Sequence, residues 1–151
     1  MKVYLDVCCL CRPFDDQTSD RIRMEAEAVI AILNQCIQDQ ALVVSEVIEY
    51  EIARIPDEEK MKAVGSLLQC AKERVTIDKQ IVNRAGMLHE SGIDSIDALH
   101  LASAESAGAL FLTTDDSLIK FIKRQDEKIH IAVYNPVQWL MEVTNGDKDA
   151  Q

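Results

Sequence analysis

Residues 94–117 read DSIDALHLASAESAGALFLTTDDS, and this stretch decides the fold class. Its first part, 94–107, is an alanine-rich segment of helical character that stops at Gly108, and glycine commonly closes a helix. A short apolar run at 110–113 follows and ends at two aspartates. A helix that returns the chain to a short apolar strand is typical of the crossovers of a parallel sheet. The stretch therefore predicts an α/β protein.

The same alternation continues on both sides of this stretch. The pattern predicts strands at residues 2–6, 41–45, 74–77, 110–113 and 129–133, and helices at residues 18–38, 46–55, 57–72, 78–89, 94–107, 117–124 and 136–143. Strands that alternate with helices indicate right-handed crossovers. We therefore expect a central, mostly parallel sheet of four to five strands with helices on both faces.

The length and composition fit one globular domain. The chain has 151 residues, of which 48% are hydrophobic and 28% charged, and it contains no repeat or linker. We expect a single domain over residues 1–144 and a frayed tail over residues 145–151. No stretch resembles a signal peptide or a membrane span. Five cysteines, an odd number, do not suggest a secreted disulfide framework, so a cytoplasmic, reducing compartment is expected.

The net charge of −10 restricts the function. An acidic protein is repelled by nucleic-acid phosphate, so the chain is not a generic binder that uses a basic patch. If the substrate is a polyanion, local basic residues or bound cations must offset this repulsion. Much of the acidity is then expected in a site that requires it.

Acidic residues follow several of the predicted strands. Asp6 ends the first strand, the strand at 110–113 runs on to Asp115, and the second strand leads into a helix that carries Glu51. Asp97 lies near the start of the helix before the fourth strand. Open parallel sheets place their chemistry beyond the carboxyl ends of the strands. We therefore expect these four carboxylates to meet at one edge.

Not every acid in these segments needs a functional explanation. At about 100° per residue, Glu51 falls in the apolar sector of the 46–55 helix, whereas Glu49 falls on the opposite, solvated side. A glutamate in a buried sector is costly unless it is paired or bound to a cation. Asp94 is a plausible N-cap, and Asp97, three residues later, benefits from the helix dipole. Glu51 therefore requires a functional explanation more than its neighbours do.

The sequence says less about which of Asp115 and Asp116 belongs to the site. One of the two is expected to cap the following helix, and Asp115 comes first after the strand. Thr113, two residues before Asp115, can donate a hydrogen bond to the Asp115 carboxylate or to a phosphate. We favour Asp115 for the site and Asp116 as the outer residue.

The cysteines near the N-terminus give only a weak signal for zinc. Cys8, Cys9 and Cys11 lack a second cysteine pair or a histidine at ligand spacing, and the three histidines are scattered. Free cysteine usually behaves as a small buried hydrophobic residue. Cys8 and Cys9 are therefore expected to pack near the site without taking part in its chemistry.

Together, four segments resemble the acidic motifs of PIN-domain nucleases, and most of all the VapC-like ribonuclease toxins of toxin–antitoxin pairs. They are the LD that ends at Asp6, SEVIEYE that ends at Glu51, DALHLASA from Asp97 and LTTD that ends at Asp115. The resemblance covers essentially the whole domain in order, and DALHLA followed by TTD is its most specific part. One residue departs from the pattern, since Cys8 stands where asparagine or serine is usual.

The resemblance implies a Mg²⁺- or Mn²⁺-dependent endoribonuclease that acts on single-stranded or looped RNA. It implies that Asp6, Glu51, Asp97 and Asp115 are the catalytic metal-binding carboxylates, with Asp94 as a further candidate. Such cations would neutralise the cluster, contact a phosphate oxygen and activate water. Phosphate contacts would come from nearby residues, for which Arg12, Thr113, Lys120 and Lys123 are candidates. A small cognate antitoxin and a homodimer are the expected partners, with no membrane.

Other functions stay open on the sequence alone. The chain could be a non-catalytic PIN-like binding or regulatory module with a degenerate first motif, which the Cys8 departure and the acidic surface would suit. A phosphatase with an aspartyl nucleophile requires the pattern DxD at the first strand, but the chain has Asp6-Val7-Cys8. A phosphorelay receiver requires a lysine after a late strand, and the LTTDD strand end does not supply one.

Overall fold

A central parallel sheet organises the computed structural model, which describes residues 1–125 and 129–149. Its strands lie in the order β3-β2-β1-β4-β5, and all four neighbouring pairs are parallel. The expectation of a mostly parallel sheet of four to five strands is thus confirmed. The strands are β1 (Lys2–Leu5), β2 (Ala41–Ser45), β3 (Glu73–Val75), β4 (Leu110–Leu112) and β5 (Val133–Tyr134).

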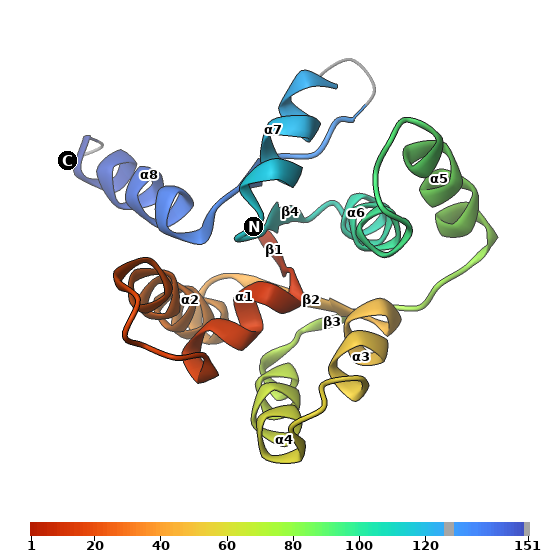
Figure 1. The fold of residues 1–151 in the computed structure, drawn as a ribbon. Helices are drawn as coiled ribbons and strands as arrows, with labels where there is room; N and C mark the ends of the chain where they lie inside the picture. The colour runs from red at the N-terminus through yellow and green to blue at the C-terminus, as the bar shows by residue number, and fades with distance from the viewer. Residues whose placement is uncertain (126–128, 150–151) are drawn as a thin grey trace.

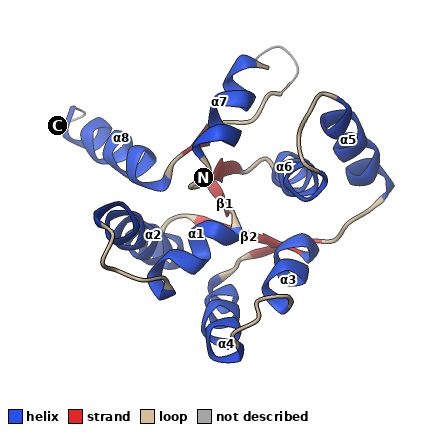
Figure 2. Cartoon of the chain, in the orientation of Figure 1, coloured by secondary structure: helices blue, strands red, loops and turns tan. Residues whose placement is uncertain are grey.

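Helices cover both faces of this sheet. Helix α2 connects β1 to β2 and lies on one side, whereas α6 leads into β4 and lies on the other (Figure 1). Figure 2 shows how little of the chain is strand compared with helix. The helices are α1 (Val7–Cys11), α2 (Asp20–Gln38), α3 (Glu46–Ala53), α4 (Glu58–Ser66), α5 (Lys79–Glu90), α6 (Ser95–Ala107), α7 (Asp116–Arg124) and α8 (Pro136–Asp149), with 3-10 turns at Arg12–Phe14 and Leu67–Cys70.

The strand order reverses between β1 and β4. From β1 the chain moves outward to β2 and then β3, whereas from β4 it moves the opposite way to β5. Parallel sheets open a crevice at such a reversal, just beyond the carboxyl ends of the two strands. Asp6 follows β1 and Thr113 follows β4, so the fold brings these two residues to the crevice.

Polar caps fix where the helices begin. The side chain of Ser19 accepts a hydrogen bond from the backbone N–H of Ile22, and Ser45 does the same for Ile48. Such caps satisfy backbone donors that have no partner within the helix. Helix α6 ends at Gly108, which has φ = 68°. This left-handed conformation is costly for residues with a Cβ, so glycine closes the helix as predicted.

The core lies on both sides of the three central strands. Tyr4 and Phe111, on neighbouring strands, are fully buried and stacked with ring centroids 5.6 Å apart. Two ionisable side chains, Glu25 and His100, are also buried in this interior. Buried polar groups require partners, and the partners of these two residues connect the core to the site described below.

Some predicted elements differ from the structure. The predicted strand at 129–133 is wrong, since β5 is only Val133–Tyr134. The predicted helix at 57–72 is α4 followed by a separate 3-10 turn, Leu67–Cys70. Helix α1 was missed, because five residues are too few to show helical periodicity.

The C-terminal helix is longer than predicted. Helix α8 extends to Asp149, six residues beyond the predicted end, so it includes part of the segment expected to fray. The domain boundary at residue 144 stays a prediction. Of the helices described, none combines the length and apolar character that crossing a membrane requires.

Candidate active site

Asp6 is held at the end of β1 by three hydrogen bonds. Its backbone N–H donates to the Leu112 carbonyl at 2.9 Å, which fixes it against β4. Its Oδ1 accepts the N–H of Val7 at 2.8 Å, and its Oδ2 accepts the hydroxyl of Thr113 at 2.9 Å. The residue is only 7% exposed. These hydrogen bonds offset the cost of burying the carboxyl group and fix its orientation.

Thr113 connects Asp6 to the fourth acidic segment. Its hydroxyl donates to Asp6 and accepts the backbone N–H of Asp115 at 3.2 Å. The expected bond from Thr113 to the Asp115 carboxylate is not the one that forms. Asp115 Oδ1 instead accepts the N–H of Leu118 at 3.1 Å and caps α7. Contact between Thr113 and a phosphate stays a prediction, and its full burial favours a role in holding Asp6.

Asp115 and Asp116 can now be distinguished. Asp116, the first residue of α7, accepts two hydrogen bonds from Arg21, at 2.8 and 2.9 Å. Asp115 stays on the side of Thr113, where its charge contributes to raising the pKa of Asp97. The assignment of Asp115 to the site stays a prediction.

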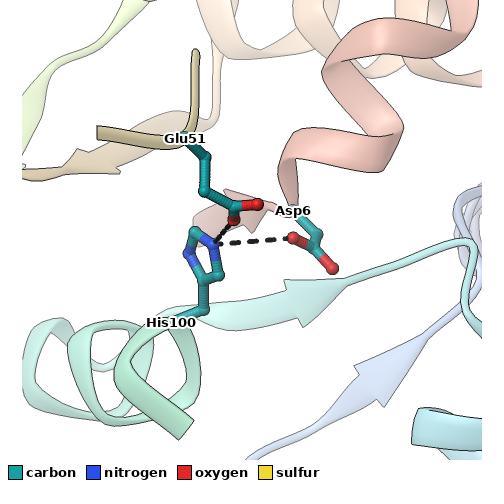
Figure 3. A group of neighbouring side chains, drawn as sticks. All are labelled: Asp6, Glu51 and His100. Atoms are coloured by element: carbon teal, nitrogen blue, oxygen red, sulfur yellow. Dashed lines mark hydrogen bonds and ion pairs between the residues drawn. The ribbon is translucent and has the colours of Figure 1, made fainter. Parts of the chain in front are cut away.

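Glu51, from α3, and Asp6 lie close together, and one ring nitrogen of His100 is directed at both carboxylates (Figure 3). His100 Nε2 contacts Glu51 Oε1 directly and lies 3.8 Å from Asp6 Oδ1. One potential ligand atom from each of these three residues lies within 4.8 Å of the others. Within the described chain, neither Asp97 nor Asp115 belongs to this group.

The sequence analysis does not include His100 in the site, because the three histidines are far apart along the chain. A signal was available, because His100 follows Asp97 by three residues on α6. Residues three apart share a helix face. An acidic residue at the start of a helix therefore makes any polar residue one turn later a candidate for the same site.

Two further buried side chains stand behind His100. Tyr4 Oη lies 2.6 Å from His100 Nδ1 and 2.6 Å from Ser45 Oγ. Tyr4, Ser45 and His100 are all fully buried. Burial raises the pKa of Tyr4 above its usual value, so its hydroxyl stays protonated. A chain of buried polar groups thus runs from β2 through β1 to Glu51.

Asp97 and Asp94 add negative charge beside this group. Burial, followed by the charges of Asp6 and Asp94, raises the pKa of Asp97 to about 6. Asp94 caps α6, since its Oδ2 accepts the N–H of Ile96 at 3.2 Å, and it is exposed. Burial is the larger cause of this rise, and repulsion from the neighbouring carboxylates adds to it.

The cysteines agree with the expected packing role. Cys9 is buried and its Sγ donates to the Leu112 carbonyl at 3.4 Å. Cys8 Sγ lies 3.5 Å from Thr113 Oγ1 and accepts the N–H of Thr114 at 3.4 Å. All five cysteines are free thiols, and none belongs to the group of candidate metal ligands found in the described residues.

The candidate phosphate-binding cations differ in their surroundings. Arg12 donates from Nε to Glu25 at 2.9 Å, from Nη1 to Asp15 at 2.9 Å and from Nη2 to Thr114 at 3.2 Å. Its charge is therefore largely used inside the fold. Lys120 and Lys123 are exposed on α7. Phosphate contacts by these residues stay predictions, and the two lysines are more exposed than Arg12.

A cavity of about 410 Å³ opens beside Glu51. Tyr50 and Arg54 belong to its wall, with the Arg54 guanidinium carbon 5.3 Å from the Tyr50 ring centroid. A larger cavity, about 670 Å³, lies between α2 and α8 and does not include the acidic group. The smaller cavity is the one that adjoins the candidate chemistry; it is lined by Val7, Tyr50, Glu51, Arg54, Ile55 and Ile96.

The donor set suits a hard divalent cation. Asp6 and Glu51 offer carboxylate oxygens within a short distance, and Asp97 adds a carboxylate whose raised pKa a cation would lower. Oxygen ligands of this kind suit Mg²⁺ and Mn²⁺, whereas zinc sites are usually built from cysteine and histidine. The two carboxylates fit a hard divalent cation, and its identity as Mg²⁺ or Mn²⁺ stays a prediction.

Solved structures share this fold at low sequence identity. The crystal structure of FitAcB from Neisseria gonorrhoeae is 20% identical, with a TM-score of 0.60 over 90% of this chain and 98% of that chain. The structure of VapBC-1 from nontypeable Haemophilus influenzae is 14% identical, with a TM-score of 0.63 over the same shares. VapBC2 from Rickettsia felis, bound to a promoter DNA fragment, is 16% identical, with a TM-score of 0.60 over 89% and 98%.

A comparison with curated proteins finds no match. The family model for the PIN domain, in contrast, matches residues 3–124, which include Asp6, Glu51, Asp97 and Asp115. This match spans most of the chain and agrees with the parallel sheet and the acidic crevice described above. The chain therefore belongs to the PIN-domain family.

Proposed function

We propose that this protein is a Mg²⁺- or Mn²⁺-dependent endoribonuclease that hydrolyses phosphodiester bonds in single-stranded or looped RNA. The observation that carries this proposal is the approach of Asp6, from the end of β1, and Glu51, from α3, to one group of ligand atoms. The cost of their repulsion is offset when a cation binds between them.

The chain's own residues would hold and orient the reacting groups. Asp6 and Glu51, supported by Asp97 and Asp115, would bind the cation, with Asp94 as an outer candidate. When bound, the cation would stabilise charge on the phosphate and activate water. Thr113 would keep Asp6 fixed, because its hydroxyl is already directed at Oδ2. Lys120 would attract the phosphate backbone from its exposed position on α7.

The cavity beside Glu51 supports a nucleic-acid substrate. Tyr50 is 52% exposed, and Arg54 lies over its ring. An exposed aromatic ring with a neighbouring arginine can stack a base, and this contact tolerates different sequences. Single strands and loops expose bases for such stacking, whereas duplexes do not. This local surface would offset the overall negative charge.

We further propose that the protein is the toxin of a toxin–antitoxin pair, acts in the cytoplasm and forms a homodimer. The resemblance to VapC-like proteins and the shared fold with the VapBC and FitAcB structures support this. A small antitoxin would silence it by inserting an arginine among the carboxylates, because a guanidinium pairs carboxylates bidentately. Co-expression with such a partner should restore the growth that the chain alone stops.

The activity is tested with purified protein and single-stranded RNA. Cleavage is expected with Mg²⁺ or Mn²⁺ and should stop on addition of a chelator. Asp6→Asn should lower the rate roughly a hundredfold or more, as expected for a lost metal ligand. Glu51→Gln should also lower it, whereas Glu49→Gln on the same helix should not, since Glu49 pairs with Arg74 at the surface.

Two results would overturn this proposal. The first is cleavage by Asp6→Asn and Glu51→Gln at the rate of the parent. The second is a parent that binds neither Mn²⁺ nor Mg²⁺ and cleaves nothing. The second result would favour a non-catalytic PIN-like module with a degenerate first motif, in which Cys8 replaces the usual asparagine or serine.

A further inference from the structure

The buried chain behind Glu51 has a defined direction of hydrogen bonding. Ser45 Oγ already accepts the backbone N–H of Ile48 at 3.2 Å, so its own proton is available for Tyr4 Oη. Tyr4 has a single O–H, which then donates to His100 Nδ1. With Nδ1 accepting, the imidazole proton lies on Nε2 and points at Glu51 Oε1.

The opposite direction satisfies fewer groups. It would send the Tyr4 proton to Ser45 Oγ, which already accepts from Ile48, and would leave the Ser45 proton with neither of these partners. A polar proton without an acceptor is costly in a site where Tyr4, Ser45 and His100 are fully buried. The helix cap at Ser45 and the Glu51 carboxylate facing Nε2 therefore favour the same tautomer of His100, with its proton on Nε2.

We propose that His100 is a positioning residue, which holds the Glu51 carboxylate in the metal site by donating a hydrogen bond from Nε2. His100 lies close enough to Asp6 and Glu51 to be mistaken for a third metal ligand. An Nε2 that carries the proton has no lone pair for a cation. Of His100 and Glu51, only Glu51 can therefore act as a metal ligand in this geometry.

Glu51 needs such support more than Asp6 does. Asp6 is fixed by Val7 and Thr113, whereas the Glu51 side chain is 34% exposed and has more rotatable bonds. Ordering a flexible glutamate costs conformational entropy each time a cation binds. A rigid, buried donor orders the Glu51 side chain before the cation binds, as hydrogen-bond partners of metal ligands commonly do. This inference rests on the proposed metal-dependent function.

The direction of the hydrogen bonds from Ser45 through Tyr4 to His100 can be tested without metal. Long-range ¹H–¹⁵N spectra of histidine-labelled, chelator-treated protein report which imidazole nitrogen carries the proton, and His100→Gln identifies the signal of His100. The expected result is a proton on Nε2 alone. A proton on Nδ1, alone or together with one on Nε2, would contradict the proposed direction of these hydrogen bonds. Because no cation is present, this result does not depend on whether the protein is a nuclease.

The positioning role is tested by Mn²⁺ calorimetry on the full chain. Tyr4→Phe keeps the ring that stacks on Phe111 but removes the donor to His100, and should weaken Mn²⁺ binding about tenfold. His100→Leu should weaken it at least as much. His100→Gln retains an N–H near the position of Nε2, so it should stay closer to the parent than His100→Leu does.

A double variant tests whether His100 acts by positioning Glu51, by binding the metal itself or only by packing in the core. If His100 acts only through Glu51, His100→Leu should have little further effect on Mn²⁺ affinity in a Glu51→Gln background. The proposal would be overturned if His100→Leu lowered Mn²⁺ affinity as much in that background as in the parent. It would also be overturned if His100→Leu and His100→Gln lowered Mn²⁺ affinity equally. Melting of each chelated variant checks folding. A parent that binds no Mn²⁺ would refute the proposed function, whereas the metal-free spectra would still decide the tautomer.

Discussion

At the scale of single residues, Thr113 connects two of the acidic segments through one hydroxyl. Thr113→Val keeps the shape but removes the donor to Asp6 Oδ2 and the acceptor for the Asp115 N–H. We expect the free energy of unfolding to fall by about 1–3 kcal/mol, because buried polar groups lose their hydrogen-bond partner. Mn²⁺ affinity should fall about tenfold. Urea unfolding and calorimetry measure the two effects, and Thr113→Ser, which keeps the hydroxyl, is the matched control.

Asp97 predicts a pH dependence of the metal-free protein. Its pKa is raised from 3.8 to about 6, mainly by burial and by the charge of Asp6. A raised pKa means that the folded state favours the protonated acid. The corresponding stability is fully present below pH 3.8 and is lost as the pH rises through about 6.

The variant Asp97→Asn removes this dependence. With chelator present, it should be more stable than the parent at neutral pH, by on the order of 1 kcal/mol after allowing for partial exposure, and equal to it at about pH 4. Thermal melts across this range measure the difference. A parent that gains stability relative to Asp97→Asn as the pH rises would contradict the repulsion inferred for the empty site.

The site residues differ in how far the sequence could predict them. The helical wheel singled out Glu51, because a carboxylate in an apolar sector needs a partner, and the structure supplies His100. The role of His100 could not be derived, because a histidine in an alanine-rich helix reads equally well as a core residue. Its partners Tyr4 and Ser45 come from two strands, β1 and β2, and the register of these strands brings them together.

At the scale of elements, the segment after β1 is held by ion pairs around Glu25. Glu25 is 1% exposed and accepts hydrogen bonds from Arg12 at 2.9 Å, Arg21 at 3.3 Å and Asn135 at 2.7 Å. Arg21 also pairs with Asp116, next to the site. One buried carboxylate thereby connects the 3-10 turn after α1, helix α2, the start of α7 and the segment before α8.

Glu25→Ala should therefore destabilise the whole fold. We expect a loss of about 3 kcal/mol in unfolding free energy, because two arginines lose their common partner. Glu27→Ala, an exposed change on the same helix, should stay within about 0.5 kcal/mol of the parent. Denaturant unfolding compares the two variants. Equal stabilities for both would show that the buried ion pairs contribute little.

Elements with strong periodicity or clear caps could be predicted, and short ones could not. Helix α2 was placed to within two residues of its observed start because Ser19 and a long apolar stripe mark it. Helix α1 has no such stripe, and its start is set by Asp6, whose carboxylate accepts the N–H of Val7. Strand β5 has only two residues, so its position depends on pairing with β4 and not on local sequence.

At the scale of the whole molecule, the crevice follows from topology. The alternation of helices and strands was enough to predict a parallel sheet, and the acids after the strands predicted its functional edge. The order of the strands could not be read from the sequence, because it depends on which crossovers pack together. The structure shows that the order reverses between β1 and β4, where Asp6 and Thr113 meet.

The net charge of −10 leads to the last prediction, which concerns metal-linked stability. A cation that binds only the folded protein adds RT ln(1 + [L]/Kd), about 2.7 kcal/mol at a hundredfold excess over Kd. For a chain of this size the melting temperature should then rise by about 5–10 °C with Mn²⁺. Sodium chloride at matched ionic strength is the control, because any salt screens the repulsion among surface charges.

Asp6→Asn separates specific binding from screening. The variant should keep the response to sodium chloride and lose most of the response to Mn²⁺, because it removes a central ligand atom of the group formed with Glu51. Its chelated form should melt no lower than the parent if relief of repulsion with Asp97 balances the weaker hydrogen bonds at Oδ1 and Oδ2. Equal responses of the parent to the two salts would mean that its acids act only as a diffuse charge.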